Sequence, residues 1–156
     1  MITKRPAALY VLAFLVFFQC ASGLFGGGSL IADPSGASLQ MPASEYLPGT
    51  PFSNYMIPGM ILGTLLGLFP LIVLVGLWRQ AEWHWAEKLN IYDNYHWAWA
   101  FSLYLGMTLI IWIDVQIALV GGGHFLQTTY GLLGVAMLIF TLLPGVMRHF
   151  RQSKGN

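Results

Sequence analysis

The sequence predicts an all-α membrane protein, a four-transmembrane-helix bundle with an ordered extracytoplasmic loop between helices 1 and 2. Of its 156 residues, 56% are hydrophobic and only 8% are charged, whereas about 25% of the residues in a soluble domain are charged. Four apolar stretches have spanning length, at approximately residues 7–25, 57–78, 97–120 and 128–146. All seven Lys and Arg residues fall on one side of this arrangement. We therefore treat residues 1–156 as one integral membrane domain.

The first predicted helix, residues 7–25, follows two basic residues. This pattern is typical of a cleaved signal peptide or of a retained signal-anchor helix. Residues 21–23, Ala-Ser-Gly, could be a cleavage site, but the apolar run continues to Phe25, beyond the usual signal-peptide core. We expect a retained helix that ends at the triple glycine of residues 26–28. Cleavage stays open as the alternative.

The segment between the first two helices, residues 29–55, is the longest polar stretch. Its Asp-Pro-Ser-Gly sequence at residues 33–36 predicts a type I turn, because Asp accepts backbone hydrogen bonds, Pro presets φ and Gly suits the last position. Further prolines exclude a long helix, and scattered apolar residues make the segment too hydrophobic for a free linker. We expect an ordered cap over the outer mouth of the bundle. Ser53 or Asn54 can then cap the second helix.

The second predicted helix, residues 57–78, contains no charge and would reach roughly 33 Å as an α-helix. Gly59, Gly63 and Gly67 recur every fourth residue. This spacing leaves a groove on one face, into which another helix of this bundle, of a second copy or of a partner can pack. Pro70 predicts a kink.

An aromatic, charged segment at residues 79–96 separates the second and third helices. Trp83, Trp85, Trp97 and Trp99 favour the headgroup level of a membrane. Anchoring at the interface is the simplest interpretation of these side chains, and contact with lipid, a quinone or a pigment is the alternative.

The third and fourth helices are predicted to be joined by a short turn. The triple glycine at residues 121–123 should end the third helix. The fourth helix, residues 128–146, should loosen in its last turn at Pro144.

The positions of the basic residues predict the orientation. Because positive charge stays on the cytoplasmic side, both termini should be cytoplasmic and the 29–55 loop should be outside. The seven basic residues are Lys4, Arg5, Arg79, Lys88, Arg148, Arg151 and Lys154.

Asp114 is the one ionisable residue inside a predicted crossing. A carboxylate at that depth is costly unless it is paired, hydrated or protonated, which makes Asp114 a functional candidate. The simpler interpretation is that Asp114 ties the outer cap to the bundle through loop amides. Proton or solute handling is the alternative.

A second polar set on the third helix shares one face at i, i+4 and i+8: Thr108, Trp112 and Gln116. Gln116 lies about 200° around the helix from Asp114, so these two side chains cannot share a face. We interpret the set as a stripe of interhelical hydrogen bonds, with the lining of a small polar cavity as the alternative.

Several function classes lack support. A net charge of +1 gives no reason to expect a nucleic-acid partner, and one cysteine cannot form an intrachain disulfide. No histidine lies inside a predicted crossing, so a haem held by two histidines between helices is not expected. No metal-ligand cluster and no motif of a hydrolase or protease occurs, so we predict no metal, no cofactor and no catalytic residue.

Three sequence segments, LIADPSGASL, GTPFSNYMIPG and WIDVQ, resemble a family of small uncharacterised four-helix bacterial integral membrane proteins. That family shares a DPSG loop and the motifs PFxxYxIPG and WIxVQ. Asp114 falls at the variable position of the last motif. The resemblance implies a four-helix membrane protein in bacteria and brings no known activity. Together with the predicted orientation, we expect a multi-pass protein of the bacterial cytoplasmic (inner) membrane. The motif residues are Asp33, Pro34, Gly36, Pro51, Phe52, Tyr55, Pro58, Gly59, Trp112 and Gln116.

Abundant packing features and missing chemical ones predict a non-catalytic accessory or structural subunit. Its expected partners are membrane lipids and other membrane-protein subunits or a second copy of itself, with no nucleic acid. The alternative is a small transporter or proton-conducting element that uses Asp114.

Overall fold

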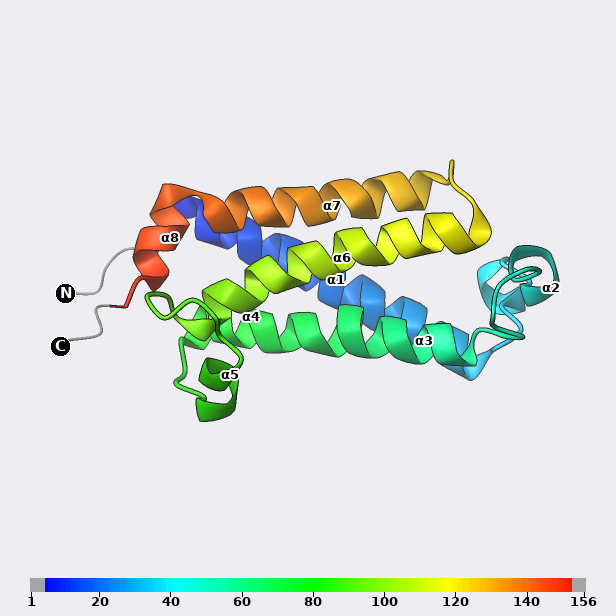
Figure 1. Ribbon diagram of the computed structural model, residues 1–156, viewed down its shortest axis with the longest axis horizontal. Coiled ribbons are helices and arrows are strands. Elements are labelled where there is room, and N and C mark those ends of the chain that lie inside the picture. Colours follow the sequence, from blue (N-terminus) through cyan, green and yellow to red (C-terminus); the bar gives the residue numbers. More distant parts are fainter. Residues whose placement is uncertain (1–4, 153–156) are drawn as a thin grey trace.

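Four helices in the computed structural model are long and apolar enough to cross a membrane, and they lie along the long axis of the molecule (Figure 1). The structure describes residues 5–152, and no strand occurs among them. The all-α prediction with four candidate spans is therefore confirmed. The spans are α1 (Ala7–Ala32), a composite second helix, α6 (Trp97–Val120) and α7 (Phe125–Leu142). The composite helix contains α3 (Met56–Gly63), the π-helical turn η2 (Thr64–Leu68) and α4 (Phe69–Arg79).

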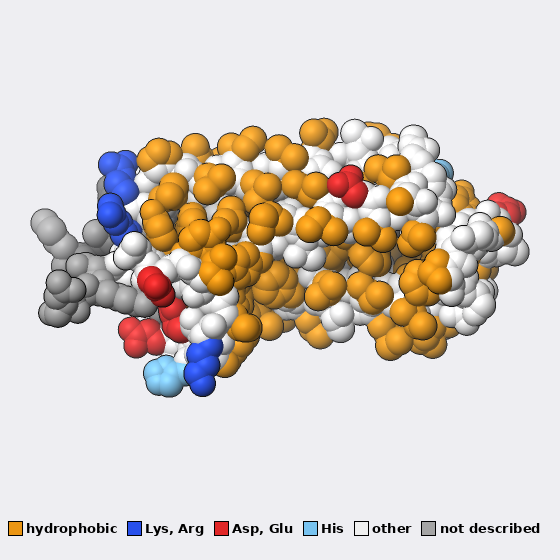
Figure 2. All heavy atoms as spheres, in the orientation of Figure 1, with side chains coloured by type: hydrophobic (Ala, Val, Ile, Leu, Met, Phe, Trp, Pro, Cys, Tyr) orange, Lys and Arg blue, Asp and Glu red, His pale blue; other side chains and the backbone are white. Residues whose placement is uncertain are grey.

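Short elements occupy the two ends of the bundle. Residues 33–55 form a cap at one end, with the 3₁₀ turn η1 (Ala37–Leu39) and α2 (Ala43–Tyr46). At the other end lie α5 (His84–Lys88) and α8 (Pro144–Phe150) (Figure 1). We call these the cap end and the basic end, because the Lys and Arg side chains visible in Figure 2 lie at the second. Lys4 and Lys154 lie outside the described residues, and the described basic residues are Arg5, Arg79, Lys88, Arg148 and Arg151.

The spans form two pairs. α1 packs along α3, η2 and α4, and α7 packs along α6. The pairs meet where α1 contacts α7 and where α4 contacts α6. The helices of each pair contact each other along a line that we call the seam of that pair. The two seams are built from different residues.

Glycines bring the backbones of the first pair together. A Cβ added to Gly27 would lie 2.5 Å from Cα and N of Gly63, and one added to Gly23 would overlap the carbonyl group of Leu66. From the other side, a Cβ at Gly59 would lie 2.9 Å from Cβ of Leu30. These small residues permit the close backbone approach that stabilises helix pairs in lipid.

The prediction that the first helix ends at residues 26–28 is wrong. α1 continues to Ala32, and the triple glycine lies inside it. Gly27 packs directly against the backbone of Gly63, where a helical glycine allows close contact. The helix ends instead before Asp33, whose backbone angles of φ −131° and ψ 85° lie outside the α region, as is usual for the residue preceding a proline. The predicted stop at residues 121–123 is different: α6 does end at Val120, and Gly121 has φ of 85°.

A buried glutamine compensates for Pro70. Proline has no N–H to donate to the carbonyl oxygen of Leu66, four residues earlier. Gln19 of α1 is 1% exposed, and its Nε2 donates to that oxygen at 3.0 Å. The sequence predicts a kink at Pro70, and the structure places the π-helical turn η2 directly before it. The side chain of Gln19 therefore ties α1 to the π-helical turn η2 of the second span.

The fourth span begins and ends earlier than predicted. His124 caps α7, with the side-chain amide oxygen of Gln127 accepting from its backbone N–H. At the other end Leu143 has ψ of 134°, and Pro144 begins the separate helix α8. Proline suits the first turn of a new helix better than the interior of an old one, so the chain breaks before it.

Candidate functional site

The two halves of α6 have very different surroundings. In the basic-side half, residues 97–106, every residue except Tyr104 is buried. The ring of Trp97 fills the space left by Gly76 of α4, and its Nε1 donates to the carbonyl oxygen of Ala81 at 2.8 Å. Trp99 Nε1 donates to the carbonyl oxygen of Thr141 at 2.8 Å. This half of α6 is enclosed by the protein itself.

The cap-side half of α6, residues 107–120, is largely uncovered. Only Leu109 and Ile113 are buried in it. Ile111 is 61% exposed. The other exposed residues of this half are Met107, Asp114, Val115, Ile117, Ala118 and Leu119.

Asp114 lies on this uncovered surface. Figure 2 shows that hydrophobic side chains cover the middle of the molecule, whereas the Lys and Arg side chains lie at the basic end. Of the described acidic residues, Asp114 alone belongs to a spanning helix. It forms no hydrogen bond or ion pair with any described residue. The expectation that Asp114 ties the cap to the bundle is therefore wrong: the cap meets the end of α6 through the side chain of Val120.

The predicted hydrogen-bonding stripe is also not formed. Thr108, Trp112 and Gln116 are half-buried, and none of them makes a side-chain hydrogen bond to a described residue. Trp112 packs against the hydrophobic core instead.

Other residues hold α6 to α7. A Cβ on Gly134 would lie 2.8 Å from Cγ1 of Ile110, so the backbones are close. Nearer the basic end, the buried hydroxyl of Thr141 donates to Ser102 Oγ at 3.2 Å. Neither this pair nor the role of Gln19 was predicted from the sequence. A signal existed for Gln19, because Pro70 frees a carbonyl oxygen and glutamine is a donor long enough to reach it.

In the cap, the Asp33 carboxylate organises the turn predicted at residues 33–36. It accepts hydrogen bonds from Ser35 Oγ, from the Ser35 N–H at 3.2 Å and from the Ser38 N–H at 2.8 Å. The hydrogen bonds from the Ser35 side chain and the Ser38 backbone hold the pKa of Asp33 below its ordinary value. The interactions of this carboxylate are thus local to the turn.

The same turn is fixed to the start of the second span. The Tyr55 N–H donates to the carbonyl oxygen of Pro34 at 2.9 Å. Gly36 has φ of 75°, and a Cβ there would lie 2.6 Å from the Tyr55 ring. Tyr55 is buried with Leu30 and Leu47, and Phe52 packs against this cluster. Tyr55, and not Ser53 or Asn54 as predicted, is the N-cap residue of α3. Asn54 precedes it, and its Oδ1 accepts from the Met56 N–H at 3.0 Å.

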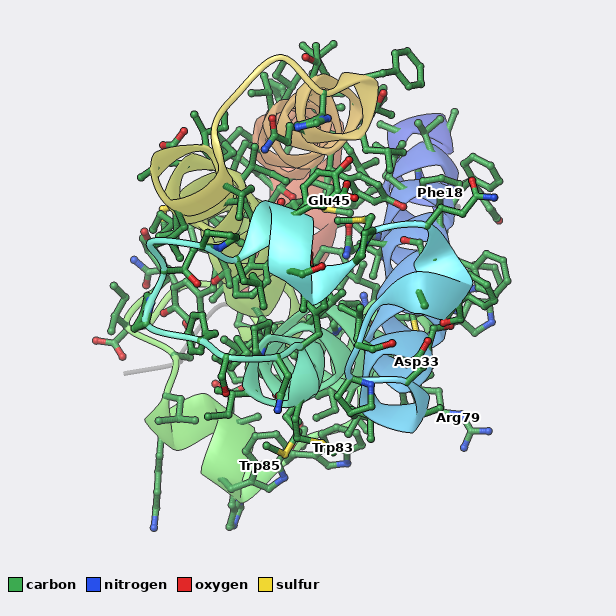
Figure 3. The ribbon with its side chains drawn as sticks, turned by 90° about the vertical axis from the view of Figure 1, so that its right-hand side faces the viewer. Phe18, Asp33, Glu45, Arg79, Trp83 and Trp85 are labelled. Carbon is green, nitrogen blue, oxygen red and sulfur yellow. The ribbon has the colours of Figure 1, made fainter. Side chains whose placement is uncertain are left out.

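Other motif residues border this unit. Pro51 is exposed, and Pro58 lies in the first turn of α3, where a missing N–H costs little. Figure 3, which looks onto the cap end, shows Asp33 and Glu45 on the cap. The motif residues of the first two segments therefore build and attach the cap, while Trp112 and Gln116 lie apart on α6.

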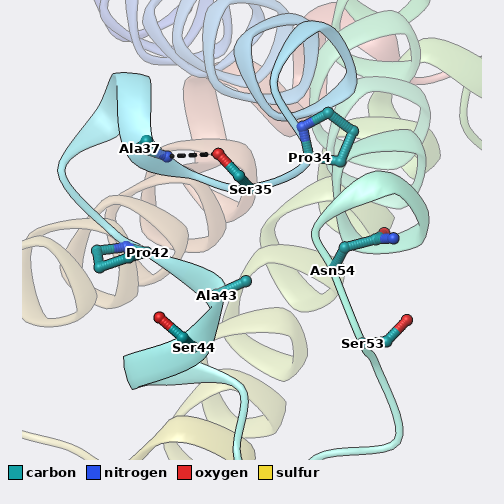
Figure 4. A pocket seen from close by; sticks show the side chains of 8 residues that line it. All are labelled: Pro34, Ser35, Ala37, Pro42, Ala43, Ser44, Ser53 and Asn54. Atoms are coloured by element: carbon teal, nitrogen blue, oxygen red, sulfur yellow. Dashed lines mark hydrogen bonds between the residues drawn. The ribbon is translucent and has the colours of Figure 1, made fainter.

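An open hollow of about 500 Å³ lies on the cap (Figure 4). No charged side chain lines it. Of its polar groups, Ser35 Oγ accepts from the Ala37 N–H and Asn54 Oδ1 from the Met56 N–H. These groups are used by the turns that carry them, which leaves little for a ligand. The lining residues are Pro34, Ser35, Ala37, Pro42, Ala43, Ser44, Ser53 and Asn54.

At the basic end three of the four predicted interfacial tryptophans, Trp83, Trp85 and Trp97, form a cluster, whereas Trp99 packs against Tyr92 and Tyr95. The rings of Trp83 and Trp97 stack with centroids 4.9 Å apart. The centroids of Trp83 and Trp85, both labelled in Figure 3, lie 5.8 Å apart. Trp97 is 0% and Trp99 2% exposed, so these two pack the interior rather than the membrane interface. Trp85, at 49% exposed, leaves the largest surface for lipid or a flat ligand.

Two histidines also lie at the basic end: His96 is buried and His149 is half-buried. His96 Nδ1 accepts from the Ala98 N–H at 3.2 Å, and burial holds the pKa of His96 below its ordinary value. Burial, with Arg5 nearby, also lowers the pKa of His149. Both rings are therefore neutral at pH 7. No group of three or more His, Cys, Asp or Glu residues in the described chain is arranged to hold a metal.

Comparison of the chain with protein-family models, with characterised proteins and with solved structures gave no match. Function must therefore be inferred from the chain's own side chains. The uncovered cap-side half of α6, with Asp114 on it, is the strongest candidate among them.

Proposed function

We propose that this protein is a non-catalytic accessory or structural subunit that packs against other membrane proteins. The observation that carries the proposal is the contrast within α6. Its basic-side half is enclosed by the fold, whereas its cap-side half is exposed and places Asp114 on the surface.

Lipid alone accounts for the apolar residues of this surface but not for Asp114. Hydrocarbon chains offer no hydrogen bond, so a carboxylate among them is unfavourable. A neighbouring protein can supply the missing partner and cover the apolar side chains around it. The location also weighs against the alternative of conduction through this chain, since Asp114 faces away from the other helices.

The proposed location is the bacterial cytoplasmic membrane, with both termini cytoplasmic. In support, the described basic residues lie at one end of the bundle, and the cap with Asp33 and Glu45 lies at the other (Figures 2 and 3). Positive charge is retained on the cytoplasmic side. The resemblance to bacterial four-helix proteins supports the same assignment.

Labelling of single cysteines tests the orientation. Ser44 is exposed on the cap and Lys88 is exposed in α5. A membrane-impermeant maleimide should label Ser44→Cys in intact cells and Lys88→Cys only after permeabilisation. The native Cys20 is buried, which keeps the background low. Labelling of Lys88→Cys in intact cells would show that the proposed orientation is wrong.

Photo-crosslinking tests the subunit role. A photoreactive amino acid at Ile111 of α6 should give protein adducts in native membranes. The same residue at Leu132 of α7 is the matched control, because Ile111 is 61% and Leu132 64% exposed. The control should give mainly lipid adducts. If Ile111 also gives lipid adducts only, and the purified protein is strictly monomeric in mild detergent, the subunit proposal fails.

A further inference from the structure

Asp114 restricts what can cover the cap-side half of α6. It lies six residues before the end of that helix, which corresponds to about 9 Å along the axis. An aspartate side chain has a single methylene, so it cannot extend to the membrane surface as a lysine does. The cap does not reach it, and no described residue pairs with it.

A second copy of this chain cannot neutralise the carboxylate. Copies inserted in the same direction bring residues of equal depth together, and the described spans contain one basic residue, Arg79. Arg79 is the last residue of α4, at the basic end. Two copies meeting at this surface would therefore place one carboxylate against another, which is unfavourable.

The neighbours of Asp114 suit a docked helix. Met107, Ile111 and Ala118 share its face at the i, i+4, i+7 and i+11 spacing of a helix-packing stripe. All four are exposed. Ala118 has a small side chain, which lets another backbone approach closely at the cap end.

We propose, on the basis of the subunit role above, that this face binds a transmembrane helix of a different protein that carries a Lys or Arg at the depth of Asp114. The cation pairs with the carboxylate by charge-assisted hydrogen bonds. The apolar residues on both sides of Asp114 pack against the partner helix and exclude lipid from the pair. Asp114 thus selects the partner, and the surrounding residues supply the contact area.

A defined peptide tests this pairing. The full-length protein, labelled with a fluorescence donor, is reconstituted in phosphatidylcholine vesicles. The probe is an acceptor-labelled Leu-Ala transmembrane peptide with one Lys at the depth of Asp114, and the reference peptide has Leu at that position. Energy transfer should show the Lys peptide binding about tenfold more tightly than the Leu peptide.

Three variants test whether Asp114 causes the preference for the Lys peptide. Asp114→Leu should abolish the preference for the Lys peptide, and Asp114→Asn should reduce it. Glu45→Gln, which removes an exposed acidic group of the cap, should leave it unchanged. Equal binding of the two peptides by the wild type, or a preference that persists in Asp114→Leu, overturns the proposal.

Crosslinking through Ile111 in native membranes separates this proposal from the subunit role. Protein adducts that are lost in Asp114→Leu support both. Adducts that persist in Asp114→Leu overturn the cationic partner but leave the subunit role intact. Adducts only to a second copy of this chain overturn the foreign partner, and the absence of any protein adduct in the wild type overturns the subunit role itself.

Discussion

The chain contains Gly-Gly-Gly twice, at residues 26–28 and 121–123, and the two copies adopt opposite structures. The first lies inside α1, where Gly27 faces Gly63 of the second span. The second ends α6 and forms the turn to α7, with Gly121 and Gly123 at positive φ. Glycine permits both outcomes, because it can enter a helix and can also adopt backbone angles closed to other residues.

The difference between the copies comes from what lies opposite them. A close neighbouring backbone makes a missing side chain favourable within a helix, since it permits tight packing. At residues 121–123 no such neighbour exists: a Cβ on Gly121 or Gly123 would have nothing within 4 Å. Without a packing partner, the conformational freedom of glycine favours the turn.

The largest effect should follow from Gly27→Leu. Its Cβ would lie 2.5 Å from the backbone of Gly63, so α1 and the second span must separate. We expect the free energy of unfolding to fall by about 3 kcal/mol or more, as for severe overpacking. Thermal unfolding of the detergent-solubilised protein measures it. An unchanged melting temperature would show that the seam does not hold the pair together.

The next effect concerns Gln19, which serves the same seam. Gln19→Leu leaves the buried Leu66 carbonyl oxygen without its donor, and should reduce the stability by about 2 kcal/mol. The control is Ser22→Ala on the same helix, because the Ser22 hydroxyl bonds only within α1. Equal stability losses in the two variants would mean that Gln19 does not compensate for Pro70.

A smaller loss should follow from Gly121→Ala. The residue has φ of 85° and ψ of 161°, a region that side chains oppose. We expect a loss of about 1 kcal/mol, because an exposed turn can adjust part of the strain. Chemical denaturation in detergent is sensitive enough to measure it. A gain in stability would contradict the assigned turn geometry.

The smallest change, and one of opposite sign, is expected for Gly28→Ala. Gly28 is exposed inside α1, and an added Cβ would meet nothing within 4 Å. Alanine favours a helix over glycine, so the stability should rise by up to about 1 kcal/mol. The same unfolding assay compares it with Gly27→Leu one position away. Destabilisation by Gly28→Ala would place the helix end at residues 26–28 after all.

In the candidate site, too, some features could be predicted from the sequence and others could not. Asp114 could be singled out from the sequence, because a charged residue in an apolar run is unusual. Its exposure could not, since the direction in which α6 faces depends on where α4 and α7 pack. For the same reason Trp97 and Trp99, which suggest a membrane interface in the sequence, are buried by α4 and α7.

The sequence by itself determined the number of candidate spans and the grouping of the basic residues at one end. It could do so because span length, apolarity and charge are properties of local segments. Only the tertiary structure decided where α1 ends, how the Leu66 carbonyl oxygen is satisfied and which half of α6 is uncovered. Each of these depends on contacts between residues far apart in the chain. The local sequence of a helix does not specify which other helix packs against each of its faces.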